Sequence, residues 1–96
     1  MSASSETLEV YFRSETFDEG SVPDKLLRDH ALKEGVFGRI VVQEGEVEFW
    51  LDSDPPTMEV VRPWDLRLRV QPGQRHWVAL RPGARFHLEL LREPRA

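Results

Sequence analysis

Hydrophobic and polar residues alternate along most of the chain, and a period of two residues is typical of β-strands. The pattern is clearest in residues 46–51, where Val47, Phe49 and Leu51 lie on one side of the expected strand. Residues 36–43 are rich in apolar side chains, which predicts a strand buried on both faces. The expected strands span residues 7–12, 36–43, 46–51, 57–61, 66–70, 76–80 and 85–91. Six or seven short strands with turns between them indicate an all-β sandwich or barrel.

The stretch from Pro72 to Leu91 is the one around which we expect a functional site. It reads as two strands joined by a tight turn at Pro82-Gly83. In an antiparallel pair this hairpin brings His76 beside residues of the last strand.

Residues 23–34 are ambiguous between a helix and a strand. Ser21 is suited to cap a helix, Pro23 fits its first turn, and Gly35 fits its end. The alternative is an extended segment in which Leu26 and His30 share one face. Local signals alone favour the helix.

Composition limits the classes of function. The 96 residues are enough for one small domain, and a net charge of -4 with interspersed signs argues against nucleic-acid binding. There are no cysteines, which excludes disulfides, thiolate metal sites and cysteine nucleophiles. No apolar run is long enough to span a membrane, and the first residues do not resemble a signal peptide. We expect a soluble protein of the cytoplasm.

Histidine and carboxylate are the candidate chemistry of this chain, since imidazole and carboxylate are ligands for zinc, iron and nickel. The candidate ligands are His30, His76, His87 and Glu89. His76 shares a face with Val78 and so is expected to point inward. Alternation on the last strand directs His87 and Glu89 outward unless that strand is covered on both faces, so His30 and His76 rank ahead of them.

Other residues have more than one interpretation. Trp50, Trp64 and Trp77 can line a ligand mouth, form a dimer interface, or simply pack. No nucleotide-binding fingerprint, phosphate loop or nucleophile elbow is present. The sequence therefore identifies no catalytic residue.

The chain resembles the TehB/YeaR-like family, in which a small cupin-type barrel occurs alone or ahead of a tellurite-resistance methyltransferase. The resemblance covers residues 15–92 and is carried by residues 22–30, 33–42, Gly45, 75–78 and 85–90. It implies a cupin-like double-stranded β-helix, or jelly-roll barrel, over residues 15–92. Residues 1–14 are then a tail and first strand, and residues 93–96 a C-terminal tail.

The family resemblance has further implications for the site. It places residues 26–32 on a strand, in preference to the helix, and puts His30, His76, His87 and Glu89 where cupin-like barrels gather metal ligands. The usual cupin His-x-His motif is missing before Gly35, however, and the methyltransferase half is absent. The resemblance therefore assigns no activity to the chain.

Three functions are consistent with these features. The first is a small cupin that binds a divalent metal and a small anionic ligand or oxyanion, steered by Arg28, Arg39 or Arg75, with a possible link to tellurite stress. The second is a metal-free small-molecule-binding or regulatory module. The third is a metal-dependent oxygenase-type enzyme. A domain this small gains from burying an edge strand, so we also expect a homodimer.

Overall fold

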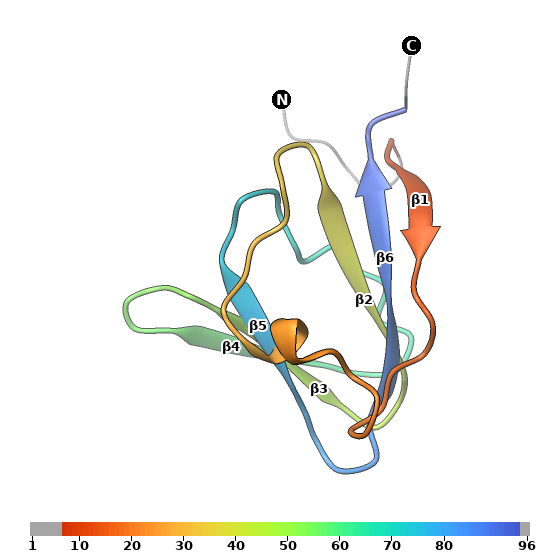
Figure 1. The fold of residues 1–96 in the computed structure, drawn as a ribbon, viewed down its shortest axis with the longest axis vertical. Coiled ribbons are helices and arrows are strands. Elements are labelled where there is room, and N and C mark those ends of the chain that lie inside the picture. The colour runs from red at the N-terminus through yellow and green to blue at the C-terminus, as the bar shows by residue number, and fades with distance from the viewer. Residues whose placement is uncertain (1–6, 95–96) are drawn as a thin grey trace.

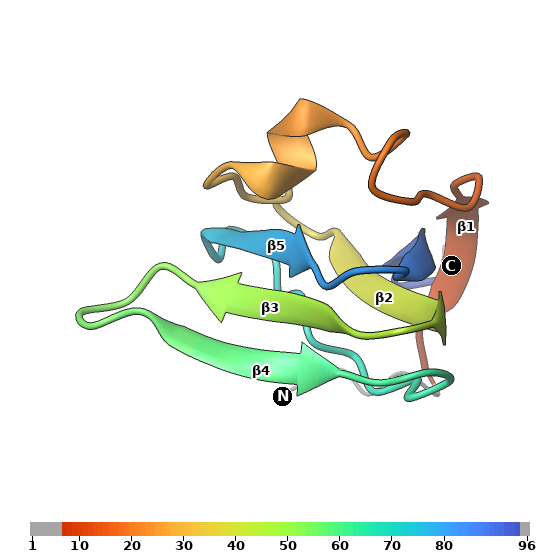
Figure 2. The same cartoon turned by 90° about the horizontal axis from the view of Figure 1, so that it is seen from below.

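Residues 7–94 are described by the computed structural model, and they form two antiparallel sheets of three strands each (Figure 1). The β6 sheet has the order β1-β6-β2 and the β3 sheet the order β4-β3-β5. The elements are β1 (Glu9–Arg13), the 3-10 helix η1 (Asp24–Leu27), β2 (Phe37–Glu44), β3 (Val47–Leu51), β4 (Thr57–Val61), β5 (His76–Leu80) and β6 (Arg85–Arg92). In Figure 2 the strands β4, β3 and β5 lie side by side as one layer, and the segment that carries η1 runs beside β5.

The core lies between the facing sides of the two sheets. Alternate residues of β2 and β6 point inward, so Val42 lies opposite Phe86 on the inner face of the β6 sheet. Val47 and Phe49 of β3 and Val78 of β5 pack in the same core cluster. Full burial of each such side chain contributes roughly 1.5–3 kcal/mol to folding, and this burial holds the two layers together.

The prediction of a small, single, all-β domain is confirmed, but one expected strand is missing. Residues 66–70 form no ladder, and only Val70 makes an isolated bridge, to Gly38. Arg67 and Arg69 of this segment bind the Asp65 carboxylate, and Leu66 is half exposed. In residues 7–94 the isolated bridges attach short segments to one sheet or the other, and the two sheets do not close into a continuous barrel.

The prediction of a hairpin between Pro72 and Leu91 is wrong. A turn does join β5 to β6, closed by a bond from the Ala84 N–H to the Arg81 carbonyl (3.0 Å). The two strands, however, belong to different sheets: β5 pairs with β3, and β6 is paired on both edges, with β1 and β2. Both edges of β6 are therefore filled by strands distant in sequence, and the turn is a crossover between layers.

Residues 23–34 follow neither of the two interpretations in full. Only η1 is helical, and one turn is enough to bury Leu26. Beyond it, His30 exchanges two backbone hydrogen bonds with His76, and the Leu32 carbonyl accepts one from Gly73. These bonds prevent a longer helix, yet a single bridge is too little for a strand.

No helix within residues 7–94 is long and apolar enough to cross a membrane.

Candidate functional site

His30 and His76 are brought together by the isolated bridge between the η1 segment and the start of β5. The His30 N–H donates to the His76 carbonyl (2.9 Å), and the His76 N–H donates back to the His30 carbonyl (2.8 Å). Their ring centroids lie 4.2 Å apart, inclined at 58°. The His76 ring also lies against Phe49 on the inner side of the β3 sheet, as its alternation with Val78 predicted. The backbone thus fixes two imidazoles side by side at the edge of the core.

Each of these rings is held by a carbonyl from its own chain segment. His30 Nδ1 lies 2.8 Å from the Arg28 carbonyl, and His76 Nδ1 lies 2.8 Å from the Gln74 carbonyl. A carbonyl can only accept, so Nδ1 carries the proton in both rings and Nε2 keeps its lone pair. Within residues 7–94 neither Nε2 has a hydrogen-bond partner. Such anchoring through the other ring nitrogen is how metal-binding histidines are oriented.

Burial keeps His76 neutral. The side chain is almost fully buried, and this desolvation lowers the pKa of His76 below 6.5, although the Gln74 carbonyl opposes the shift. A neutral imidazole is the form that ligates metals or accepts a hydrogen bond. The ring therefore keeps its lone pair free to lower pH than an exposed histidine does.

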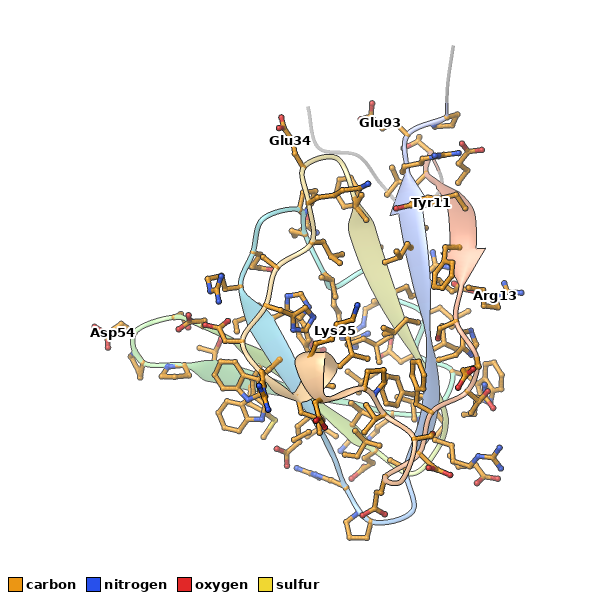
Figure 3. The ribbon with its side chains drawn as sticks, in the orientation of Figure 1. Tyr11, Arg13, Lys25, Glu34, Asp54 and Glu93 are labelled. Atoms are coloured by element: carbon orange, nitrogen blue, oxygen red, sulfur yellow. The ribbon has the colours of Figure 1, made fainter. Side chains whose placement is uncertain are left out.

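Both imidazoles line a cavity of about 420 Å³ between the two sheets. Most of its wall is apolar and comes from Phe12, Leu26, Ile40, Val78, Leu88 and Leu90. Lys25 and Ala31 are exposed residues of the same lining, so the cavity opens to solvent beside η1. In Figure 3 the Lys25 side chain projects from η1.

Glu89 lies on β6 but is engaged by two arginines. It sits directly opposite Arg13 of β1 and Arg39 of β2, and their guanidinium nitrogens lie 2.8 and 2.7 Å from its two carboxylate oxygens. Burial acts to raise the pKa of Glu89, but the hydrogen bonds from Arg13 and Arg39 outweigh it, and the net pKa is lowered. This carboxylate is occupied as the centre of an ion-pair cluster.

His87 has the opposite tautomer from His30 and His76. The Gln43 amide nitrogen donates to His87 Nδ1 (2.9 Å) and also to the Thr16 hydroxyl (2.9 Å). Because Nδ1 accepts, the proton is on Nε2, which is buried without a hydrogen-bond partner and lies 3.7 Å from the Glu89 carboxylate. His87 therefore presents no free lone pair.

The four residues predicted as metal ligands fall into two pairs. Leu88 and Leu90 line the cavity with His30 and His76, and Glu89 also borders it. Alternation along β6 nevertheless directs the side chains of His87 and Glu89 to the face opposite Leu88 and Leu90. Their burial means that the outer face of β6 is covered, which is the condition the sequence left open. In the part of the chain that the structure describes, no group of three or more histidine, aspartate and glutamate side chains is placed to hold one ion.

Of the three predicted arginines only Arg39 lines the cavity, and its charge is already paired. Arg39 pairs with Glu89, Arg75 pairs with Asp29 (3.1 Å), and Arg28 is exposed and does not line the cavity. Lys25 lines it and has no ion pair among the described residues. No motif marks Lys25 in the sequence, since its place beside the buried Leu26 of η1 follows from the fold.

The tryptophans do not contribute to the cavity. Trp50 and Trp77 stack on neighbouring strands with ring centroids 5.7 Å apart and nearly parallel planes. They lie on the outer face of the β3 sheet, since the residues that alternate with them face the core. Trp64 is 62% exposed. A role in lining a ligand mouth is thus not supported for any of the three.

Residues 13–88 match the TehB-like domain family. The fold resembles the crystal structure of TehB from Haemophilus influenzae, with a TM-score of 0.80 and 20% identity over 91% of this chain. The chain spans about a third (32%) of that TehB chain. It also resembles a protein from E. coli strain K12, with a TM-score of 0.85 and 15% identity, over 99% of this chain and 100% of that one. No curated protein matches the sequence.

Proposed function

The chain belongs to the TehB-like domain family, and we propose that it is a binding domain that holds a divalent metal ion between the His30 and His76 imidazoles. The single observation that carries the proposal is the matched anchoring of both rings through Nδ1. It leaves two neighbouring Nε2 lone pairs at one cavity wall. A zinc, iron or nickel ion accepts imidazole nitrogen readily.

The donor set fits an open site better than a structural one. Structural zinc sites are closed by four protein ligands, whereas sites that bind small molecules leave positions for water or ligand. Two imidazoles leave several coordination positions of the ion unfilled, and the neighbouring cavity wall is apolar. An ion held there would supply positive charge that fixes the anionic end of a small ligand. The protein would supply the orientation of the rings and a largely apolar cavity wall.

The family context supports anion binding and leaves turnover unassigned. TehB-like proteins are linked to tellurite resistance, and a small oxyanion is thus one ligand to test. The cupin-like relation suggested by the sequence is part of this proposal, supported by two facing sheets with histidines on the inner wall. Since the chain matches only part of TehB, methyl transfer is not proposed for it.

A metal-free binding module is the second candidate. It is favoured by the number of available ligands, because within residues 7–94 only His30 and His76 line the cavity without an ion pair, whereas Glu89 is held by two arginines. In that case each Nε2 lone pair accepts a hydrogen bond from the ligand instead of binding an ion.

Isothermal titration of zinc, nickel and ferrous ions into the EDTA-treated protein, without a histidine tag, separates these candidates. His30→Ala and His76→Ala should each weaken binding by about a hundredfold or more, since even the loss of a supporting hydrogen bond costs roughly 10- to 100-fold. His87→Ala is the matched control and should leave the affinity unchanged. Absence of binding by the parent protein, or equal loss in the control, refutes the metal site.

A further inference from the structure

The cavity is much larger than an inorganic oxyanion requires. Its volume of about 420 Å³ equals roughly fourteen waters at about 30 Å³ each. An ion of one central atom and three or four oxygens displaces only about three or four of them. The remaining volume would then hold water against an apolar wall, which is unfavourable. A volume of this size falls within the range typical of organic small-molecule pockets.

The polar groups of the lining are few. Ser14 is occupied, because its hydroxyl donates to the Glu15 carbonyl and accepts from the Leu88 N–H. Arg39 and Glu89 pair with each other. Among the described lining residues, uncommitted polar atoms therefore belong to His30, His76 and Lys25, and to Arg39 through its unbonded Nε.

The Lys25 ammonium brings a positive charge to this lining. The side chain is exposed, it lies on η1 beside the opening, and it has no ion-pair partner among residues 7–94. A carboxylate at this place would gain a charge-assisted hydrogen bond. The wall formed by Ile40, Leu88 and Leu90 would cover an apolar body attached to that carboxylate.

We infer that the ligand of the cavity is an organic anion with an apolar body, a medium-chain or similar carboxylate, whose charged end lies at Lys25 and the imidazole pair. The inference rests on the proposed function in one respect, because the ion between His30 and His76 adds to the charge that holds the carboxylate. A bare oxyanion is then a poor ligand, since it uses the charge but not the apolar wall.

Calorimetric titration of octanoate, hexanoate, 1-octanol and tellurite into zinc-loaded and EDTA-treated protein tests the inference. Octanoate should bind most tightly. Hexanoate should bind about fifteenfold more weakly, because each of its two missing methylenes is worth about fourfold when buried. Lys25→Met should weaken octanoate about tenfold and leave 1-octanol unchanged, whereas Lys33→Met, on the exposed loop, should change neither. Ala31→Trp should block octanoate at the opening without altering the core.

The outcomes separate this inference from the metal proposal. Zinc binding without octanoate binding overturns the inference and leaves the metal site standing. Lys25-dependent octanoate binding by a protein that takes no zinc upholds the inference and removes the metal. Tellurite binding as tight as octanoate binding, or octanoate binding indifferent to Lys25→Met, overturns the inference.

Discussion

Replacement of Glu89 by glutamine removes the charge at the centre of the cluster on the outer face of β6. Glu89 is 5% exposed and binds Arg39, whose side chain is 15% exposed, and Arg13, which is largely in water. Glutamine has nearly the same shape, so packing is preserved. Arg39 is then left as a buried cation without a counter-ion, and its Nε has no hydrogen-bond partner even in the parent protein.

The expected cost follows from that buried charge. Removal of one partner of a buried ion pair typically costs 3–5 kcal/mol, and the exposure of Arg13 places Glu89→Gln at about 3 kcal/mol. This is a large part of the roughly 5–15 kcal/mol that holds a domain together. At roughly 4–8 °C per kcal/mol for a domain of this size, the melting temperature should fall by roughly 12–24 °C.

Urea and thermal unfolding followed by circular dichroism measure this cost. Glu93→Gln is the matched control, because Glu93 is exposed (Figure 3) and should change the free energy of unfolding by less than about 0.5 kcal/mol. Methionine at both Glu89 and Arg39 should recover much of the loss, since no buried charge is then left unpaired.

The pH dependence gives an independent check. The folded pKa of Glu89 lies below its ordinary value of 4.5, so its stabilising effect is complete above that pH and is lost as the pH falls through the folded value. The difference between the parent protein and Glu89→Gln should shrink below about pH 4.5. A Glu89→Gln variant as stable as Glu93→Gln at neutral pH would refute the buried ion pair.

Three other perturbations have clear expectations. Arg69→Met should lower the free energy of unfolding by about 2–4 kcal/mol, and Arg67→Met should lower it much less, because both bind the same carboxylates but their side chains are 4% and 71% exposed. Equal losses in urea unfolding would contradict this. Gly45→Ala should lower the free energy of unfolding by about 1–3 kcal/mol more than Gly73→Ala does. Both glycines have positive φ, but only a Cβ at position 45 would clash, at 2.8 Å from a backbone atom. Equal melting temperatures of the two variants would contradict this. Phe12 is exposed on the edge strand β1, which a second copy of the chain can cover, so sedimentation should give twice the chain mass of 11.2 kDa. Phe12→Glu should reduce the measured mass to that of one chain, and a single-chain mass for the parent protein excludes the homodimer.

The sequence predicted the strands well where burial of one face imposes alternation. Residues 46–51 and 85–91 match β3 and β6 within one residue, because inward side chains such as Val47 and Phe86 must recur at every second position. Strand partners were not predictable in the same way. The Pro82-Gly83 turn looks like a hairpin turn locally, but both edges of β6 are filled by β1 and β2, whose distance along the chain is not encoded in the turn.

The site was only partly predictable for a related reason. The inward direction of His76 followed from its alternation with Val78, and the His30 pairing depends on one bridge that no local pattern signals. Tautomers depend on partners far away in sequence, such as Gln43 beside His87. The role of Glu89 likewise depends on the two arginines opposite it. Their positions opposite Glu89 follow from the strand register, and no sequence motif predicts that register.

Long-range proton–nitrogen NMR of the histidine side chains during zinc titration tests the central claim most directly. The three imidazoles should appear in two tautomeric classes before metal is added, with the proton on Nδ1 in His30 and His76 and on Nε2 in His87. Zinc should then shift the Nε2 signals of His30 and His76 together and leave His87 unchanged. A shift confined to His87, or no shift in either member of the pair, would contradict a metal site at this cavity wall.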